Sequence, residues 1–270
     1  MQSALALEAR EARIEVQMLL QAVLQVSRAY LLAHPERELN EAELLAYRAL
    51  LQRRLTGEPM AHILGEREFF GLNLKVTPAT LIPRPETELL VELALERLPQ
   101  GVCMLDLGTG SGAIALAIAH VRPDVEVLAV DASLAALAVA QGNAQRLGQT
   151  NVAFLDSDWF SALAGRRFDL IVSNPPYIAA ADEHLARGDV RFEPLSALVS
   201  GVDGLDDIRR IVVGACAHIH SEGWLLLEHS YDQAAAVRGL LQAAGYAEVF
   251  SMHDLAGIER VSGGRLGQGI

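Results

Sequence analysis

The sequence is poor in cysteine, in positive charge and in long apolar runs, and each deficit excludes a class of protein. Only two cysteines occur in 270 residues, too few for the disulfide framework of a small secreted domain. We therefore expect Cys103 and Cys216 to be buried free thiols. No cluster of Cys and His has the spacing of metal ligands, so the sequence predicts no metal site.

Positive charge is outnumbered, because 22 Lys and Arg stand against 34 Asp and Glu, a net charge of -12. A protein that grips nucleic acid unaided usually carries a basic stripe, and no dense Lys/Arg run is present. The balance argues against direct, independent binding to nucleic acid. It leaves room for a protein partner that is itself associated with RNA.

Long apolar segments are missing as well. No stretch approaches the roughly 20 apolar residues of a membrane span, and charges interrupt the N-terminus where a secretory signal would need an apolar core. We therefore expect a cytoplasmic protein with no membrane association. What the chain does have is 51% hydrophobic residues, enough for the core of one large domain or two modest ones.

The first sixty or so residues predict a small helical unit. Apolar residues recur at helical spacing from residue 4 to about 33, where His34-Pro35 ends the run. Asn40 is a good N-cap for a second helix, which we expect to extend to about Leu55. From residue 63 to 76 the pattern alternates loosely, which predicts a β-hairpin or an extended linker.

From residue 101 onward, expected strands alternate with expected helices. The strands are predicted at 102–107, 125–130, 152–155, 168–172, 224–228 and 246–252. The helices are predicted at 87–98, 113–120, 134–147, 204–220 and 233–244. This alternation predicts an α/β fold with a mostly parallel sheet covered on both faces, whose ligands bind at the carboxyl ends of the strands. The glycine-rich tail, residues 263–270, is expected to fray.

A glycine-rich segment joins the strand at 102–107 to the next helix, and its residues are Asp106, Leu107, Gly108, Thr109, Gly110, Ser111 and Gly112. Its glycines permit a tight turn and let a ligand approach the backbone. With Asp131 about 20 residues on, the loop alone fits a nicotinamide cofactor as well as S-adenosylmethionine. Asp106 shifts the balance, because a carboxylate would repel a pyrophosphate but suits the ammonium and sulfonium of S-adenosylmethionine.

The segment Asn174-Pro175-Pro176-Tyr177 follows the strand at 168–172, at the edge where ligands bind. Asn174 offers a side-chain oxygen as a hydrogen-bond acceptor. The prolines lack N–H groups, so the turn can present a backbone carbonyl beside that oxygen. Two acceptors match the two hydrogens of a planar –NH2 group, and Tyr177 supplies an aromatic face to stack on it. The motif therefore predicts methylation of an amide-like nitrogen.

Such a site meets a chemical need, because the lone pair of an amide nitrogen is delocalised and barely nucleophilic. Accepting both amide hydrogens orients the nitrogen and helps as positive charge builds on it. The alternative is a plain strand-terminating turn, since Asn-Pro and Pro-Pro are common punctuation. We favour the catalytic interpretation because the motif follows a glycine-rich loop and an acidic second strand end, in that order.

With these motifs in place, nearly the whole chain resembles the peptide chain release factor glutamine N5-methyltransferases, the HemK/PrmC-type family. The Asn-Pro-Pro-Tyr motif is shared with adenine methyltransferases, so the specificity of the resemblance comes from the helical N-terminal unit and from further stretches. These stretches are Gly57-Glu58-Pro59, Leu81-Ile82-Pro83-Arg84-Pro85-Glu86-Thr87-Glu88, Val190-Arg191-Phe192-Glu193-Pro194 and Leu225-Leu226-Leu227-Glu228-His229.

The resemblance implies a seven-stranded, Rossmann-like class I methyltransferase domain at 85–270. A helical substrate-recognition domain at 1–62 and a β-hairpin linker at 63–84 would precede it. It implies S-adenosyl-L-methionine as methyl donor, S-adenosyl-L-homocysteine as product and no metal. The implied substrate is the glutamine of the Gly-Gly-Gln motif in class-I release factors, modified by a monomeric enzyme.

The resemblance also implies roles for individual residues. Gly108 to Gly112 would cradle the methionine part of the cofactor, and Asp131 would hold the ribose hydroxyls. Trp159 would lie by the adenine, whose amine Asp158 would receive. Asn174 would meet both cofactor and substrate, and the remaining residues of the glutamine pocket would be Pro175, Pro176 and Tyr177.

Three alternatives use the same motifs. Glutamine methylation of a ribosomal protein differs only in the N-terminal domain and the linker. Methylation of the exocyclic amine of adenine needs a base flipped from a duplex, and the acidic balance disfavours it. A binding module without chemistry would have little reason to keep an intact cofactor loop.

Two further polar stretches each have two interpretations, and three histidines have no expected catalytic role. The stretch Arg84 to Glu88 is ordinary helix-start chemistry, with a proline and acidic residues in the first turn, or it closes over the cofactor. Arg191 to Glu193 either packs against the substrate cleft or forms a surface ion pair. No catalytic role is expected for the isolated histidines His184, His229 and His253.

Overall fold

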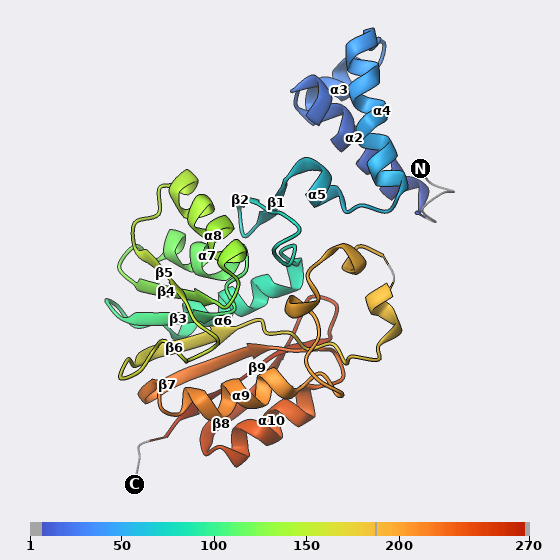
Figure 1. Ribbon diagram of the computed structural model, residues 1–270. Coiled ribbons are helices and arrows are strands. Elements are labelled where there is room, and N and C mark those ends of the chain that lie inside the picture. Colours follow the sequence, from blue (N-terminus) through green and yellow to red (C-terminus); the bar gives the residue numbers. More distant parts are fainter. Residues whose placement is uncertain (1–6, 187, 268–270) are drawn as a thin grey trace. The chain divides into compact units, whose positions relative to one another are not determined.

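The computed structural model describes residues 7–186 and 188–267, and these residues divide into two compact units (Figure 1). One unit holds the chain up to Glu66 together with His184–Phe192. The other holds Arg67–Glu183 and the chain from Glu193 onward.

The N-terminal unit is helical, as predicted, but its first helix is interrupted. Its helices are α2 (Ala9–Leu24), α3 (Arg28–Ala33), α4 (Glu41–Leu55) and α5 (Met60–Leu64). The single helix expected to end near residue 33 is wrong, because Gln25 adopts the left-handed conformation and Ser27 caps a new helix. The expected start, residues 4 to 6, lies outside the described residues.

Helix α4 begins where the sequence indicated. The Asn40 side chain accepts a hydrogen bond from the Glu43 N–H at 2.9 Å, and the Glu43 carboxylate accepts one from the Asn40 N–H at 2.9 Å. This reciprocal pair is a capping box, which satisfies two N–H groups at the start of the helix. The second predicted helix is therefore confirmed.

An ion pair and a backbone contact tie a distant segment to this unit. The buried guanidinium of Arg54 on α4 pairs with both carboxylate oxygens of Glu15 at 2.8 Å, and with Asp189 at 3.4 Å. Arg191 donates to the backbone oxygen of Thr56 at 2.9 Å. The predicted boundaries at 62 and 84 stay predictions. In addition, described residues of the later segment His184–Phe192 group with these helices.

The second unit begins with the expected hairpin, β1 (Glu66–Phe69) and β2 (Leu72–Lys75), and contains a seven-stranded sheet. The sheet runs in the order β5-β4-β3-β6-β7-β9-β8. Its strands are β3 (Cys103–Leu107), β4 (Glu126–Asp131), β5 (Val152–Asp156), β6 (Phe168–Ser173), β7 (Ile219–Glu228), β8 (Tyr246–His253) and β9 (Glu259–Leu266). The first five in spatial order are parallel, and β9 is antiparallel to both of its neighbours.

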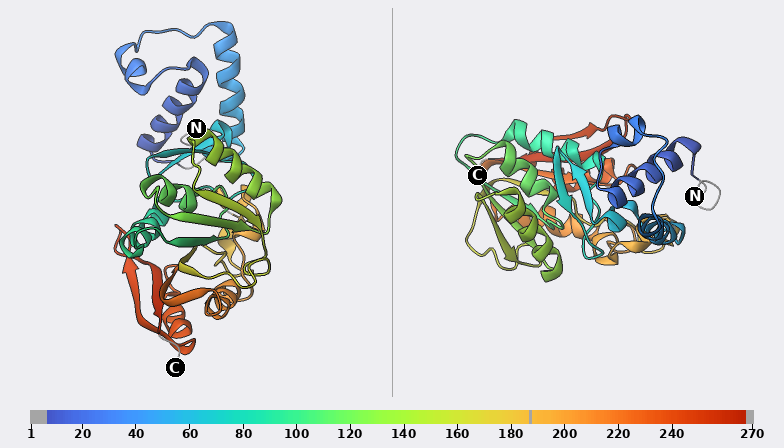
Figure 2. Two further views of the ribbon diagram at one scale, coloured as in Figure 1. Left: turned by 90° about the vertical axis from the view of Figure 1, so that its left-hand side faces the viewer. Right: turned by 90° about the horizontal axis from the view of Figure 1, so that it is seen from above.

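Helices cover both faces of the sheet (Figures 1 and 2). On one face lie α6 (Glu88–Arg97), α7 (Ala113–Val121) and α8 (Leu134–Leu147), and their apolar side chains share a core with the hairpin. On the other lie α9 (Asp206–Ala215) and α10 (Ala234–Ala243). Short 3₁₀ turns complete the chain at η1 (Pro85–Thr87), η2 (Glu183–Ala186), η3 (Val190–Phe192) and η4 (Leu195–Ala197). The predicted α/β class and mostly parallel sheet are confirmed.

The expected fraying of the glycine-rich tail is wrong for residues 263–266, which form the end of β9 between β7 and β8. A β-carbon at Gly263 would lie 2.5 Å from a methyl carbon of Leu226 and 2.8 Å from the backbone oxygen of Leu225. The glycines thus permit close packing in the sheet rather than flexibility. Residues 268–270 of that prediction lie outside the described residues.

Two smaller expectations also change. The helix predicted at 204–220 ends at Ala215, and β7 begins four residues later at Ile219, which pairs with Phe168. Both thiols are free as predicted, but Cys103 and Cys216 are half-buried rather than buried. Among the described residues, none of the helices is long and apolar enough to cross a membrane.

Candidate active site and cofactor pocket

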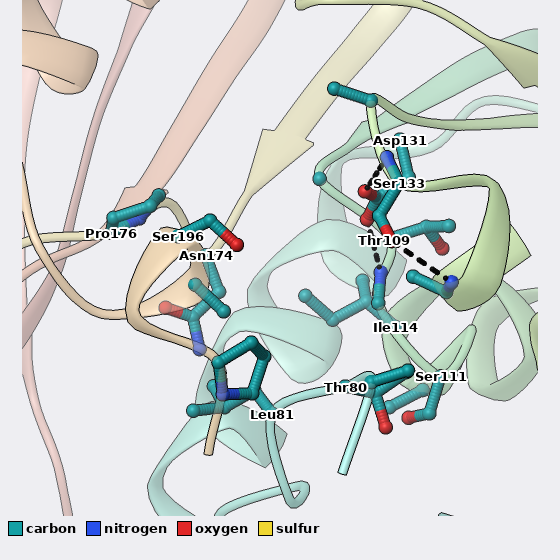
Figure 3. A pocket seen from close by; sticks show the side chains of 18 of the residues that line it. Thr80, Leu81, Thr109, Ser111, Ile114, Asp131, Ser133, Asn174, Pro176 and Ser196 are labelled. Carbon is teal, nitrogen blue, oxygen red and sulfur yellow. Dashed lines mark hydrogen bonds between the residues drawn. The ribbon is translucent and has the colours of Figure 1, made fainter. Parts of the chain in front are cut away.

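A cavity of about 350 Å³ lies at the carboxyl ends of β3, β4 and β6, where the sequence predicted a ligand site. Figure 3 shows Asp131 on one wall, Asn174 and Pro176 on the opposite wall, Thr109 next to Asp131, and Ser111 beside Thr80. Nine of the predicted site residues line it, namely Gly108, Thr109, Gly110, Ser111, Asp131, Asp158, Trp159, Asn174 and Pro176. The other four, Asp106, Gly112, Pro175 and Tyr177, are not among the residues that line it.

The glycine-rich loop leaves β3 in a tight turn anchored to the neighbouring strand. The N–H groups of Gly108 and Thr109 both donate to the backbone oxygen of Val130 at 2.9 Å. Gly108 has φ +72°, and a β-carbon there would lie 3.4 Å from the Trp159 ring. The missing side chain therefore lets the turn form and brings bare backbone to the cavity.

Asp131 ends β4 and holds the loop from the side. Its Oδ2 accepts a hydrogen bond from the Gly110 N–H at 2.9 Å, and its Oδ1 accepts one from the Ser133 N–H at 2.8 Å. The Ser133 side chain in turn caps α8 by accepting from the Ala136 N–H. The carboxylate thus stands on the cavity wall with its orientation fixed.

Asp106 lies beneath the loop and not in the cavity. It is fully buried, and its Oδ2 accepts from the Thr109 hydroxyl at 2.7 Å and from the Ala115 N–H at 3.3 Å. Burial raises its pKa to about 7. Direct contact with a cationic cofactor stays a prediction, and the geometry assigns Asp106 the support of Thr109.

Gly112 serves the packing of α7 rather than the lining of the cavity. It has φ +85°, and a β-carbon would lie 3.0 Å from Leu116 and 3.2 Å from Ala140 on α8. A side chain at Gly112 would crowd Leu116 and Ala140, and it would be strained at this positive φ.

Asn143 is a residue that sequence reasoning missed. Buried within α8, it donates to the backbone oxygens of Lys75 and Ser111 at 2.9 Å and accepts from the Lys75 N–H at 2.8 Å. One side chain therefore joins the hairpin to the glycine-rich loop. The available sequence clue was an amide among the apolar residues of an otherwise amphipathic helix.

Trp159 and Asp158, for which the resemblance implies contact with the adenine, both line the cavity. The Trp159 ring lies beside Gly108, and its indole N–H donates to Asp207 at 3.1 Å, which holds the ring against the cavity. Asp158 is exposed, and both of its carboxylate oxygens lie 3.0 Å from Arg210. Its proposed acceptance of the adenine amine therefore competes with this ion pair.

Asn174 has a buried side-chain oxygen that the described residues leave without a hydrogen bond. Its Nδ2 donates to the Thr87 hydroxyl at 3.1 Å, whereas its Oδ1 is buried and has no hydrogen-bond partner within the described part of the chain. An unpaired buried acceptor costs about 1–3 kcal/mol. Because Asn174 lines the cavity, a ligand that donates a hydrogen bond would remove this cost.

Tyr177 lies behind Asn174 with its hydroxyl 3.5 Å from Oε1 of Glu228, and burial raises the pKa of the phenol. Its backbone oxygen accepts from Gln233 at 3.0 Å. Tyr177 is not on the cavity wall, so its stacking on a substrate stays a prediction.

Arg84 and Glu193 connect two loops at the cavity. Arg84 lines the cavity and pairs with the buried carboxylate of Glu193 at 2.6 Å, and Glu193 also accepts from the Ile82 N–H at 3.3 Å. Glu193 is therefore not part of a surface ion pair, and that interpretation of residues 191–193 is wrong. The Arg84 stretch both starts a helix and borders the cavity.

The three histidines lie apart from the cavity lining. His184 and His253 are exposed. His229 is buried, with its ring nitrogens 2.8 Å from Ser262 Oγ and from the backbone oxygen of Ser230, and burial lowers its pKa. In the part of the chain that is described, no three His, Cys, Asp or Glu side chains are grouped as metal ligands.

The residues present fit S-adenosylmethionine. Glycine backbone, an acidic side chain at the end of the second strand and a tryptophan ring share one cavity with an unpaired Asn174 oxygen. The volume falls in the usual range of small-molecule sites. A phosphate-binding cofactor fits less well, because Asp131 faces the loop N–H group that would otherwise bind phosphate.

Both parts of the chain match families of known proteins. Residues 2–65 match the family model of the PrmC N-terminal domain, and residues 85–189 match that of the methyltransferase small domain. A release factor glutamine methyltransferase from Burkholderia pseudomallei is 55% identical over 269 residues, covering 96% of this chain and 93% of the relative. One from Escherichia coli is 52% identical over 254 residues, covering 94% and 92%.

Solved structures share the fold. A methyltransferase from Pyrococcus furiosus has a TM-score of 0.57 at 18% identity and covers 81% of this chain and 98% of its own. A T. thermophilus 16S rRNA N2 G1207 methyltransferase, solved with AdoMet and guanosine, has a TM-score of 0.54 at 24% identity. It covers 74% of this chain and 49% of its own. At these identities the likeness concerns the fold alone.

Proposed function

The chain belongs to the family of release factor glutamine methyltransferases, and on that premise we propose that it methylates a glutamine side chain. The methyl donor is S-adenosylmethionine, and the acceptor is the amide nitrogen of the glutamine in the Gly-Gly-Gln motif of class-I release factors. The observation that carries the proposal is the buried, unpaired Oδ1 of Asn174, a residue that lines the cavity.

The cofactor would lie between the glycine-rich loop, Asp131 and Trp159. Loop backbone would receive its methionine part, the Asp131 carboxylate would accept from its ribose hydroxyls, and the Trp159 ring would pack on its adenine. When bound there, S-adenosylmethionine supplies an electrophilic methyl group carried on a sulfonium.

The chain's own contribution is to bind and orient the amide. Asn174 Oδ1 accepts one hydrogen of the substrate –NH2 group, and a backbone carbonyl of the proline turn accepts the other. These two acceptors hold the nitrogen for in-line attack and stabilise the positive charge that grows on it. The proton leaves after the transfer. The cavity needs no metal for this chemistry, and we propose that the enzyme works as a monomer.

Mass spectrometry of the substrate tests the proposal. The protein is incubated with S-adenosylmethionine and purified release factor, and the Gly-Gly-Gln peptide is then sequenced. We expect one added methyl group on that glutamine, and none when the glutamine is replaced by alanine. Parallel reactions contain ribosomal protein or single-stranded DNA. An unmodified release factor, with methyl groups on either of those substrates, would overturn the assignment.

A further inference from the structure

The orientation of the Asn174 amide needs a cause. Rotating a side-chain amide by half a turn exchanges its oxygen and its –NH2 group while leaving its shape almost unchanged. Only one orientation leaves the side-chain oxygen free to accept a hydrogen bond from the substrate, and the proposed function depends on it. The other would present a donor to the substrate amide hydrogens and repel them.

Thr87 is the group that distinguishes the two orientations. This buried side chain lies at the start of α6, and its oxygen accepts the Nδ2–H of Asn174 at 3.1 Å. A hydroxyl can also donate one hydrogen bond. If that proton pointed at Asn174, the flipped amide would be favoured. The orientation of the Asn174 side-chain amide therefore depends on the direction of the Thr87 hydroxyl proton.

The Glu228 carboxylate can accept the proton of the Thr87 hydroxyl. Glu228 is the last residue of β7. The residue before it, Leu227, pairs in register with Ser173, the residue before Asn174. The two side chains therefore leave adjacent strands at the same level. The carboxyl is almost completely buried, and the Tyr177 hydroxyl lies 3.5 Å from its Oε1. The Thr87 hydroxyl is close enough to this carboxyl to lower its pKa. Within the described residues, its Oε2 has no hydrogen-bond partner.

We propose that Glu228 is a positioning residue for Asn174. Its carboxylate accepts the hydrogen bond of the Thr87 hydroxyl, which commits the Thr87 lone pair to Asn174 Nδ2 and keeps Asn174 Oδ1 free for the substrate. Glu228 does not line the cavity, so it acts through Thr87 and does not touch the reacting atoms. This inference rests on the proposed function and adds to it the residues that set the polarity of the amide site.

The protonation state of Glu228 gives the relay a pH dependence. Burial raises its pKa to about 7, Arg260 on β9 opposes that rise and Glu86 on η1 adds to it. Above this pKa the carboxylate accepts from Thr87. Below it the carboxyl group carries a proton that it can donate to Thr87, whose own proton then turns to Asn174. Methyl transfer should therefore fall as pH drops through about 7.

Paired variants test the relay through catalysis. Thr87→Ser keeps the hydroxyl and Thr87→Val replaces it at nearly equal size. We expect Thr87→Val to lower kcat about tenfold or more, as for a lost buried hydrogen bond, with little change in cofactor affinity. Thr87→Ser, which keeps the hydroxyl, should retain the wild-type kcat. Glu228→Gln should lower kcat and abolish the acid limb of the pH profile. Glu259→Gln, which alters a partly buried carboxylate paired with Arg238, should keep both.

An NMR measurement decides the relay independently of methyl transfer. In protein labelled with ¹⁵N-asparagine, the side-chain signal of Asn174 is the one lost in Asn174→Ser. We expect this signal to shift with an apparent pKa near 7 in the wild type and in Thr87→Ser, and to stay constant in Glu228→Gln and Thr87→Val.

The outcomes separate the two proposals. A wild-type protein that leaves the release factor unmethylated but shows the titrating Asn174 signal would defeat the proposed function and keep the relay. A signal that does not titrate in the wild type, or that titrates equally in Glu228→Gln, would overturn the relay even if methylation is seen.

Discussion

The carboxylate of Asp131, at the end of β4, accepts a 2.9 Å hydrogen bond from the N–H of Gly110 in the loop that follows β3. The same carboxylate fixes the Ser133 N–H at the start of α8. An acidic side chain at this point therefore does two things, since it shapes the glycine-rich loop and leaves negative charge on the cavity wall.

Asp131→Asn should weaken cofactor binding. The amide keeps one acceptor but places a donor opposite one of the two N–H groups, and it removes the charge proposed to bind ribose hydroxyls. Loss of a charged hydrogen bond costs about 1.5–3 kcal/mol, which corresponds to roughly a 10- to 150-fold rise in Kd. Calorimetry with S-adenosylhomocysteine measures it.

The matched control is Asp156→Asn. Asp156, on β5, pairs in register with Asp131 on β4. It is exposed and does not line the cavity. Its substitution should leave Kd unchanged. Equal losses in both variants would mean that long-range charge, and not the position of Asp131, governs binding.

Asn174→Ala should separate binding from chemistry. The variant loses the acceptor proposed to orient the substrate amide, so we expect kcat to fall about 10²- to 10³-fold, as when one preorganised catalytic hydrogen bond is removed. Affinity for S-adenosylhomocysteine should change less than about tenfold. Single-turnover methyl transfer and calorimetry give the two values. Asn73→Ala, on an exposed position of β2, is the control, and turnover retained in Asn174→Ala would remove Asn174 from its proposed role.

The motif-bearing parts of the site could be predicted from sequence because local geometry determines them. Glycines at a strand-to-helix turn, an acid ending the next strand and Asn-Pro-Pro-Tyr after a third strand all meet at one sheet edge once the strands are parallel. The structure brings Gly108, Asp131 and Asn174 to one cavity, as that rule requires.

The rest depends on long-range contacts that residue patterns do not encode. Asn143 contacts Lys75 across 68 positions, and Thr87 contacts Asn174 across 87. The residue pattern is equally silent on which motif residues line the cavity, and Asp106 and Tyr177 are not among the lining residues. Gly263 misled for another reason, since the same glycine suits a frayed tail and a tightly packed strand.

Buried Asp106 should make stability depend on pH. Its pKa is about 7 in the folded protein and about 3.9 in the unfolded chain. The folded state therefore binds the proton more tightly, and the stability contributed is complete below pH 4 and is lost as pH rises to about 7. The difference in unfolding free energy between wild type and Asp106→Asn should change by about 2–3 kcal/mol between pH 5 and pH 8, with the wild type favoured at low pH. Urea titrations at several pH values measure it, and a constant difference would contradict a raised pKa.

Gly263→Ala should destabilise the sheet. The added methyl group would lie 2.5 Å from Leu226, 2.8 Å from the Leu225 backbone oxygen and 3.1 Å from Phe250. Such overpacking costs about 1–3 kcal/mol, so the midpoint of urea unfolding should fall. Gly267→Ala is the matched control, because nothing lies within 4 Å of its added carbon and its effect should stay within about 0.5 kcal/mol. Equal midpoints for the two variants would mean that β9 separates easily from β7, and that residues 263–266 behave as the loose tail that their glycines suggest.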